Sequence, residues 1–294
     1  MNDIPNEKSK FETTYLNINE SVFKVKFKKG DNKKDCIIWL PGRNDYFYHY
    51  HISQILNEYD IYILIYRNCH EMKDDISDYF FDIKDVIEEI NVLYSHFKVN
   101  EYENVVLYGH STGGLIATIY QNETQNKVSK IVLNAPFYKY KLGTLDYYYF
   151  NYFLYYIIPL IPEFDLNKNT FNDNLYVNML SEKFNIDTLY KKKYNVPVVS
   201  SWFRNITKYH SHITNNKVKL KYPTLILYSD HSTSVKGSYK GDEILDIKLN
   251  LDQVEYLGEC KLYLIKDACH DVLSSYYKYA LDEAIICLTN FLES

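Results

Sequence analysis

The stretch VVLYGHSTGGLIA, Val105 to Ala117, places one serine and three glycines between two apolar segments. The whole chain has only nine glycines in 294 residues, so three of them around Ser111 is a marked local bias. The β-branched run before the glycines predicts a strand, and the apolar run after them predicts a helix. Ser111 would then lie in a tight strand-to-helix turn, either as a reactive side chain or as part of an ordinary corner.

Gly109-His110-Ser111-Thr112-Gly113 matches the G-x-S-x-G nucleophile elbow. In this motif the two flanking glycines remove Cβ atoms that would clash with the neighbouring strand and helix. Thr112 would begin the helix, which points its backbone N–H to the place where an oxyanion forms. A plain corner or a phosphate-binding turn explains the glycines but not a serine centred between them, and the chain has no GxGxxG or GxxxxGK[ST] motif. The motif therefore favours Ser111 as a nucleophile.

Composition restricts the class of protein. A chain of 294 residues with 46% hydrophobic and 24% charged residues suits one large domain, or one domain with an insertion. The net charge of -5 and the pI near 6.0 provide no basic stripe for a phosphate backbone, so no nucleic-acid partner is expected. The five cysteines form no CxxC pair and lack a histidine spacing suited to zinc, so no metal is expected. The polar N-terminal segment favours a cytoplasmic location.

Apolar runs of strand length recur along the chain, with segments of helix length between them. Strands are expected at 36–40, 61–66, 104–109, 130–136, 222–229 and 261–266, and helices at about 75–97, after Ser111, near 249–257 and at 272–292. Such runs are typical of parallel strands buried on both faces, and their alternation with helices predicts a doubly wound, mostly parallel α/β sheet. Val22–Phe27 alternates apolar residues with lysine, and DNKK after Gly30 indicates a turn, which together predict an antiparallel edge hairpin at the N-terminus.

The alternation stops after Pro136 and resumes at Tyr222. This break predicts a core built from residues 1–136 and 222–294, with residues 137–221 inserted as a cap or lid between two strands of the sheet.

The insertion opens with YYYFNYFLYYIIPLIPEF, residues 147–164, which is dense in aromatic side chains. Its two prolines, its asparagine and its many tyrosine hydroxyls make it a poor membrane span. A lid over an apolar pocket is favoured, with Tyr147, Phe150 and Phe153 as substrate-binding residues, while simple packing on the sheet edge is the competing interpretation. Weak contact with a membrane surface through this lid is left open.

An acyl-transfer serine also needs a base and a second oxyanion donor. His270 follows the last expected strand in YLIKDACHDVL, which is the place of the histidine in the chain order serine, acid, histidine. The N–H of Arg43, in the loop after the strand at 36–40 and just past Gly42, is the candidate donor that would act with Thr112.

The acid is less well defined by spacing. Asp230 follows its strand directly, and Ser232 occupies the usual place of the acid. Further on, after the detour HSTSVKGSYKG, the segment GDEILDI leads into the next helix as an acid loop does. We therefore rank Asp242 first, Asp246 second and Asp230 third, since some carboxylate is needed to fix the histidine tautomer and to stabilise its protonated form.

With these segments the chain resembles the α/β-hydrolases, and within them the serine-aminopeptidase and monoacylglycerol-lipase-like, or lysophospholipase-like, branch. The matching segments are WLPGRNDYF, LYGHSTGGL, IVLNAPF, GDEILDI and ACHDVLSS, which span nearly the whole chain. Pro41 is a departure, because the family usually has histidine before this glycine. The resemblance implies a serine hydrolase that acts on acyl compounds through an acyl-enzyme, without a metal or an organic cofactor, but the fold alone does not define the substrate.

The aromatic insertion favours an apolar acyl ester or a lipid as the substrate, as in a carboxylesterase, lysophospholipase or monoacylglycerol lipase. A peptidase or an acyltransferase would use the same residues, and product analysis would distinguish the transferase. A hydrolase-like binding protein without turnover is the alternative from another class. The intact serine and histidine count against that alternative, and the displaced acid counts for it.

Overall fold

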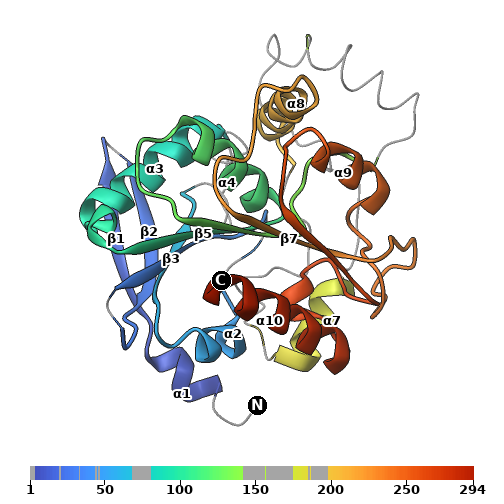
Figure 1. The fold of residues 1–294 in the computed structure, drawn as a ribbon, viewed down its shortest axis with the longest axis horizontal. Helices are drawn as coiled ribbons and strands as arrows, with labels where there is room; N and C mark the ends of the chain where they lie inside the picture. The colour runs from blue at the N-terminus through green and yellow to red at the C-terminus, as the bar shows by residue number, and fades with distance from the viewer. Residues whose placement is uncertain are drawn as a thin grey trace.

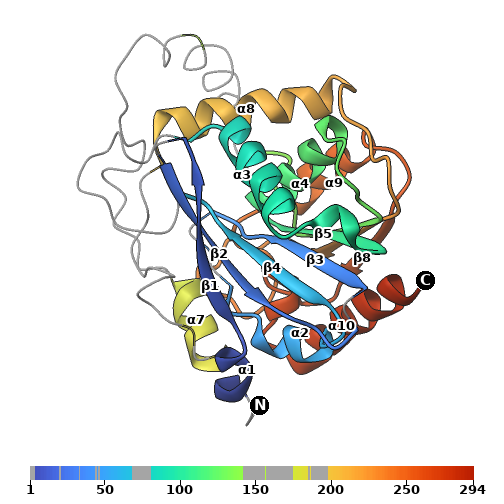
Figure 2. The same cartoon turned by 90° about the vertical axis from the view of Figure 1, so that its left-hand side faces the viewer.

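The computed structural model describes residues 4–19, 21–32, 34–43, 45, 47–67, 81–141, 156, 175–184, 186 and 198–294. Its strands form one sheet of order β1-β2-β4-β3-β5-β6-β7-β8 with helices on both faces (Figure 1, Figure 2). The strands are β1 (Glu12–Ile18), β2 (Ser21–Lys28), β3 (Asp35–Leu40), β4 (Asp60–Ile65), β5 (Asn104–His110), β6 (Lys130–Asn134), β7 (Thr224–Ser229) and β8 (Lys261–Ile265). Pairing is antiparallel for β1 with β2 and β2 with β4, and parallel for every other neighbouring pair. This confirms the predicted fold class.

The helices of the described residues cover the two faces of the sheet. They are α1 (Ile4–Ser9), α2 (Tyr50–Ile55), α3 (Ile83–His96), α4 (Thr112–Glu123), α7 (Leu175–Phe184), α8 (Ser200–Thr214), α9 (Ile247–Val254) and α10 (Lys278–Glu293), with the 3-10 turns η2 (Val99–Glu101) and η5 (Val272–Ser274). Helices α3, α4, α8 and α9 lie on one face, and α2, α7 and α10 on the other (Figure 1). Within these residues, no helix combines the length and apolar character needed to cross a bilayer.

The two-sided cover explains why the central strands are apolar throughout. In β3, Cys36, Ile38 and Leu40 pack into the core under α3 and α4, and Ile37 and Trp39 pack into the core under α2 and α10. Successive side chains of a strand point to opposite faces, so both sets must be apolar.

The crossovers diverge between β3 and β5. These strands are parallel neighbours, with Leu40 opposite Gly109, yet the chain continues from β3 into α2 on one face and from β5 into α4 on the other. Loops that leave adjacent strands in opposite directions open a crevice at the carboxyl edge of a sheet. The segment beginning at Pro41 and the turn at Ser111 both lie there.

The N-terminal hairpin is present, but its turn is not at DNKK. β1 pairs with β2, with Ile18 opposite Ser21, so the chain reverses between these two residues. The segment after Gly30 instead connects β2 to β3, which are separated in the sheet by β4. The sequence pattern did not predict β1, because it is an edge strand with mostly polar, exposed side chains, of which Leu16 alone is buried.

Two helices are shorter than predicted. α3 begins at Ile83 because Asp82 caps it, its carboxylate accepting the N–H of Lys84 at 2.9 Å; the predicted part before residue 81 lies outside the described residues. The single helix predicted at 272–292 is divided into η5 and α10. The break lies between them, where the backbones of Ser275 and Tyr277 are extended, with ψ of 139° and 131°.

The insertion between β6 and β7 contributes helices to both faces. α8 packs through Phe203, Ile206 and Tyr209 into the core under α3 and α4. α7 packs through Leu180 on the other side, in a cluster with Leu281 of α10. A separate cap over residues 137–221 therefore remains a prediction, and residues 147–164, apart from Tyr156, lie outside the described part of the chain.

Candidate active site

Ser111 is held in a left-handed backbone conformation at the end of β5. Its φ is 52° and its ψ is -117°, which a non-glycine residue rarely adopts. Its N–H donates to Asn134 O at 3.0 Å, and its carbonyl accepts the N–H groups of Gly114 at 2.9 Å and Phe137 at 3.0 Å. Contacts from β6 and α4 thus hold the turn, and backbone strain of this kind clusters at functional sites.

The flanking glycines allow three segments to meet at this turn. A Cβ atom added to Gly109 would lie 2.4 Å from Gly113 O, and one added to Gly113 would lie 2.1 Å from Leu40 O. Neither position has room for a side chain, as the motif predicts. A Cβ added to Gly114 would lie 2.8 Å from Pro136 Cβ, so this glycine lets α4 approach the end of β6.

The loop after β3 lies directly against the elbow. A Cβ on Gly42 would come within 3.1 Å of Ser111 Cβ. Asp45 anchors the loop, because its Oδ2 lies 2.8 Å from His110 Nδ1 and accepts the N–H of Gly42 at 3.4 Å. Arg43 follows Gly42 and so lies beside the serine.

Thr112 is the first residue of α4, and the first N–H groups of a helix have no acceptor within it. The helix N-terminus also carries a partial positive charge, which favours a developing oxyanion. The two candidate oxyanion donors therefore come from the loop after β3 and from the N-terminus of α4, on either side of Ser111.

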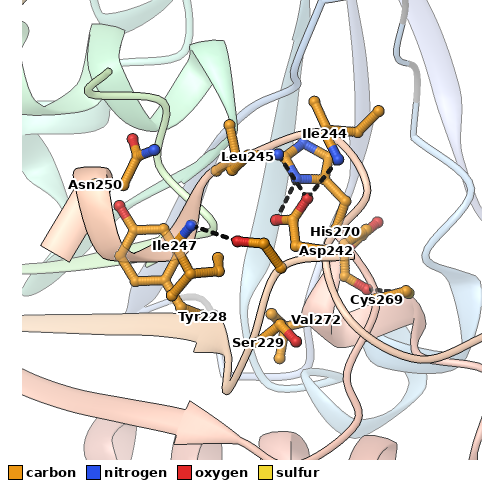
Figure 3. Close-up of polar contacts among 12 residues, drawn as sticks. Tyr228, Ser229, Asp242, Ile244, Leu245, Ile247, Asn250, Cys269, His270 and Val272 are labelled. Atoms are coloured by element: carbon orange, nitrogen blue, oxygen red, sulfur yellow. Dashed lines mark hydrogen bonds and ion pairs between the residues drawn. The ribbon is translucent and has the colours of Figure 1, made fainter. Parts of the chain in front are cut away.

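His270 and Asp242 form a buried pair (Figure 3). His270 Nδ1 lies 2.8 Å from Asp242 Oδ2. The other carboxylate oxygen accepts the N–H groups of Ile244 and Leu245, each at 2.8 Å. This arrangement favours the tautomer with the proton on Nδ1 and leaves Nε2 to act as a base. The His270 ring lies 5.1 Å, centroid to centroid, from the ring of His110, which places it beside the elbow.

The other two candidate acids have different partners. Asp246 is the N-cap of α9 and accepts the N–H of Leu249 at 3.1 Å. Asp230 accepts the N–H of Asp267 at 2.9 Å and lies 2.6 Å from His231 Nδ1. Of the three, Asp242 is the one that the structure brings to His270.

The detour in the sequence does not move Asp242 away in space. Asp242 forms a parallel bridge with Ser232, its N–H donating to His231 O and its carbonyl accepting the N–H of Thr233, both at 2.9 Å. Asp242 therefore lies next to Ser232, at the position predicted for an acid, although the intervening residues loop out. Gly241 permits the return, since its φ is 79° and a Cβ there would lie 2.6 Å from the His231 ring.

A buried network centred on Asp271 lies beneath the site and was not predicted from the sequence. Asp271 Oδ2 accepts from Tyr48 OH and His49 Nε2, each at 2.6 Å, and Asp271 Oδ1 accepts from Asn134 Nδ2 at 2.6 Å. Burial opposes ionisation of Asp271, but electrostatic attraction to His49 and His110, together with the hydrogen bonds from His49 and Tyr48, holds its pKa well below the usual value. The carboxylate is thus ionised and fully engaged.

Asn134 connects this network to the serine. Its backbone carbonyl accepts the N–H of Ser111, and its side chain bonds both Asp271 and the N–H of Val272. The available sequence signals were indirect: Asp271 directly follows His270, and Asn134 ends a strand at the same edge of the sheet.

An aromatic wall borders the elbow. Phe137 follows β6 and stacks on Trp202 of α8, with ring centroids 6.2 Å apart and planes 13° apart. The guanidinium carbon of Arg43 lies 5.2 Å from the Trp202 ring centroid. The predicted substrate-binding residues Tyr147, Phe150 and Phe153 lie outside the described residues. In the part of the chain that is described, no cluster of three or more His, Cys, Asp or Glu side chains could hold a metal ion.

Comparisons with known proteins agree with this architecture. The family model described as serine aminopeptidase, S33, matches residues 34–274, whereas no curated protein matches the chain. A soluble variant of monoglyceride lipase from Saccharomyces cerevisiae is similar in structure, with 16% identity and a TM-score of 0.68 over 96% of this chain and 94% of that one.

Two further solved structures have the same fold. A monoacylglycerol lipase from Paleococcus ferrophilus is 14% identical, with a TM-score of 0.67 over 92% of this chain and 99% of that one. A putative hydrolase from Agrobacterium vitis S4 is 16% identical, with a TM-score of 0.58 over 96% and 98% of the two chains. At these identities the likeness shows a common fold.

Proposed function

The chain belongs to the serine aminopeptidase S33 family of α/β-hydrolases, and from that premise we propose that it cleaves carboxylic esters through an acyl-enzyme on Ser111. The observation that carries this proposal is the buried pair of His270 with Asp242 beside the strained elbow of Ser111. A nucleophile, a base and an orienting acid are the parts that acyl transfer requires.

In the proposed mechanism, Ser111 Oγ attacks the substrate carbonyl while His270 Nε2 takes the proton of the Ser111 hydroxyl. The N–H groups of Arg43 and Thr112 donate to the oxyanion, and each such donor contributes about 3 kcal/mol to transition-state stabilisation. The intermediate collapses as His270 returns the proton to the leaving alcohol. A water molecule, activated by His270 in the same way, then attacks the acyl-enzyme and releases the carboxylic acid and Ser111. Asp242 orients His270 throughout.

The substrate is proposed to carry an apolar acyl chain. Phe137 and Trp202 supply an aromatic surface next to the serine, and binding pockets for small molecules are lined mainly by such side chains. Two of the proteins with this fold are named as lipases of monoacylglycerols, which supports a lipid-like ester by analogy alone. The family description names an aminopeptidase, so a peptidase is the second candidate.

The test compares kcat/KM of the wild type and Ser111→Ala on p-nitrophenyl esters of increasing acyl length and on leucine p-nitroanilide. We expect ester hydrolysis by the wild type and its loss in Ser111→Ala. Anilide hydrolysis that exceeds ester hydrolysis would favour the peptidase. Including glycerol and analysing the products separates hydrolysis from acyl transfer.

A further inference from the structure

Arg43 places a positive charge at the aromatic wall of the site. Its backbone follows Gly42, which contacts Ser111, and its guanidinium lies over the indole of Trp202. The Arg43 charge also acts on Tyr140: burial raises the pKa of this phenol, and electrostatic attraction to Arg43 opposes the rise. Phe137 stacks on Trp202 and packs edge-on against Tyr140, so the cation lies beside a wall of three aromatic side chains.

Trp202 adds a second polar group to this wall. The residue is 8% exposed, and its buried Nε1 has no hydrogen-bond acceptor among the described residues. An indole nitrogen can only donate. A buried donor without a partner costs about 1–3 kcal/mol, so such a group in a folded protein calls for an explanation, and a ligand oxygen would supply the missing acceptor.

Both groups are connected to the nucleophile elbow, Arg43 through the neighbouring Gly42 and Trp202 through Phe137. The backbone N–H of Phe137 donates to Ser111 O at 3.0 Å, and Phe137 carries Trp202 on its ring face. A guanidinium and an indole N–H both donate and neither accepts. Together they recognise an oxygen acceptor, and a guanidinium matches a carboxylate or a phosphate in particular.

We propose that the natural substrate is an acyl ester that also bears a carboxylate or phosphate, bound by the Arg43 side chain with Trp202 Nε1 as a second donor. This inference rests on the proposed ester hydrolase function and gives Arg43 a role in specificity besides that of its backbone N–H. The anionic group can belong to the acyl part or to the alcohol part of the ester, and matched substrates distinguish the two.

The experiment measures the ratio of kcat/KM for an anionic ester to that for its neutral counterpart. Mono-p-nitrophenyl adipate against p-nitrophenyl hexanoate tests an anion on the acyl part. A monoacylglycerol phosphate against the same monoacylglycerol tests an anion on the alcohol part. In at least one pair the wild type should prefer the anionic ester by about tenfold or more, as expected for a charge-assisted hydrogen bond.

Arg43→Gln should bring this ratio close to one. Any change in the oxyanion hole affects both esters of a pair and cancels in the ratio. Trp202→Phe, which keeps an aromatic face and removes the N–H, should lower the ratio partially. Arg204→Gln is the matched control, because this substitution removes the same charge from a residue of α8 that is not among the buried residues of the helix. The ratio should stay at the wild-type value.

Hydrolysis of both pairs without preference, or a preference that Arg43→Gln retains, would overturn the anion site and leave the ester hydrolase standing. If the wild type hydrolyses none of these esters, the proposed function fails, and calorimetry then decides the anion site. Hexyl phosphate should bind Ser111→Ala at least about tenfold more tightly than hexanol does, and adding Arg43→Gln should abolish the difference. Equal binding of the two probes would refute the site.

Discussion

Ser111 illustrates how single residues set up this site. A serine in a left-handed conformation costs about 1–3 kcal/mol, and it persists because the surrounding hydrogen bonds over-determine the turn. Gly109 and Gly113 contribute by lacking a side chain, since a Cβ at either would fall within 2.4 Å of a backbone oxygen. The G-x-S-x-G motif reflects the need for glycine at these two crowded positions, so the turn could be predicted from sequence alone.

The three candidate acids give a direct prediction at this scale. Asp242→Asn should lower kcat on a p-nitrophenyl ester by roughly 10³- to 10⁴-fold, because the imidazole loses the carboxylate that orients it. Asp246→Asn should keep most of the activity, since asparagine caps a helix as well as aspartate does. Asp230→Asn should also keep it. A large loss confined to Asp246→Asn or Asp230→Asn would contradict the pairing of Asp242 with His270.

Residue spacing could predict part of the site. The strand-end positions of Ser111 and His270 follow from the order of elements, and GDEILDI suggested Asp242 by its place before a helix. The contribution of Ser232, Gly241 and Asp271 could not be predicted, because it depends on a backbone bridge and on buried side chains that meet from distant segments.

The loop between β8 and α10 shows how whole elements support these residues. This loop contains both His270 and Asp271. The Asp271 carboxylate accepts hydrogen bonds from Tyr48, His49 and Asn134. The loop is thereby attached both to the segment after β3 and to the end of β6. These segments also hold the loop of Arg43 and the turn at Ser111.

Asp271→Asn should therefore destabilise the fold. Removing one partner of a buried hydrogen-bonded charge costs about 3–5 kcal/mol, and urea unfolding would show it as a lower midpoint. Asp282→Asn is the control, because Asp282 forms only a half-exposed pair with Lys278 and should change stability by less than about 1 kcal/mol. Equal midpoints for the two variants would show that Asp271 does not secure the loop.

His210 of helix α8 hydrogen-bonds to Phe137 beside the site, and its burial predicts that stability depends on pH. His210 Nε2 bonds Phe137 O at 2.9 Å, and burial lowers the pKa of His210 from 6.5 to about 3. Between these values the unfolded chain binds a proton that the folded chain does not, so stability falls as pH falls through this window. His51, whose pKa burial lowers to about 4, acts with the same sign.

Urea midpoints at pH 7 and pH 5 would measure this effect. Wild type should lose stability on the order of 2 kcal/mol through His210 alone, from 1.36 kcal/mol per pKa unit. His210→Gln should lose correspondingly less between the two pH values. His96→Gln, at an exposed position of α3, should behave as the wild type does. An identical pH dependence in all three proteins would rule out His210 as the titrating group.

Over the whole molecule, the order of the strands brings the site together. β3, β5, β6 and β7 are parallel neighbours, so the loops that follow them meet at one edge of the sheet, together with the loop after β8 (Figure 1). The apolar strands and their alternation with helices could be predicted, because burial on both faces requires apolar residues at every position. β1 could not, since an edge strand with one exposed face lacks that signal.

The paths of long insertions are also beyond pattern analysis. The break after Pro136 predicted that a segment is inserted, but α7 and α8 pack on opposite faces of the sheet through contacts with α10 and with the core under α3 and α4. Their sequences carry an apolar stripe and no information on which surface it will meet. The substrate preference inferred for Arg43 depends on α8 in the same way, because Trp202 lies on that helix.

The central claim, that Ser111 is a nucleophile activated at this site, is tested most directly by labelling with a fluorophosphonate and locating the adduct by peptide mass spectrometry. The account predicts one adduct on Ser111, its absence in Ser111→Ala, and much slower labelling in His270→Ala. An adduct on another residue, or undiminished labelling of Ser111→Ala, would contradict it.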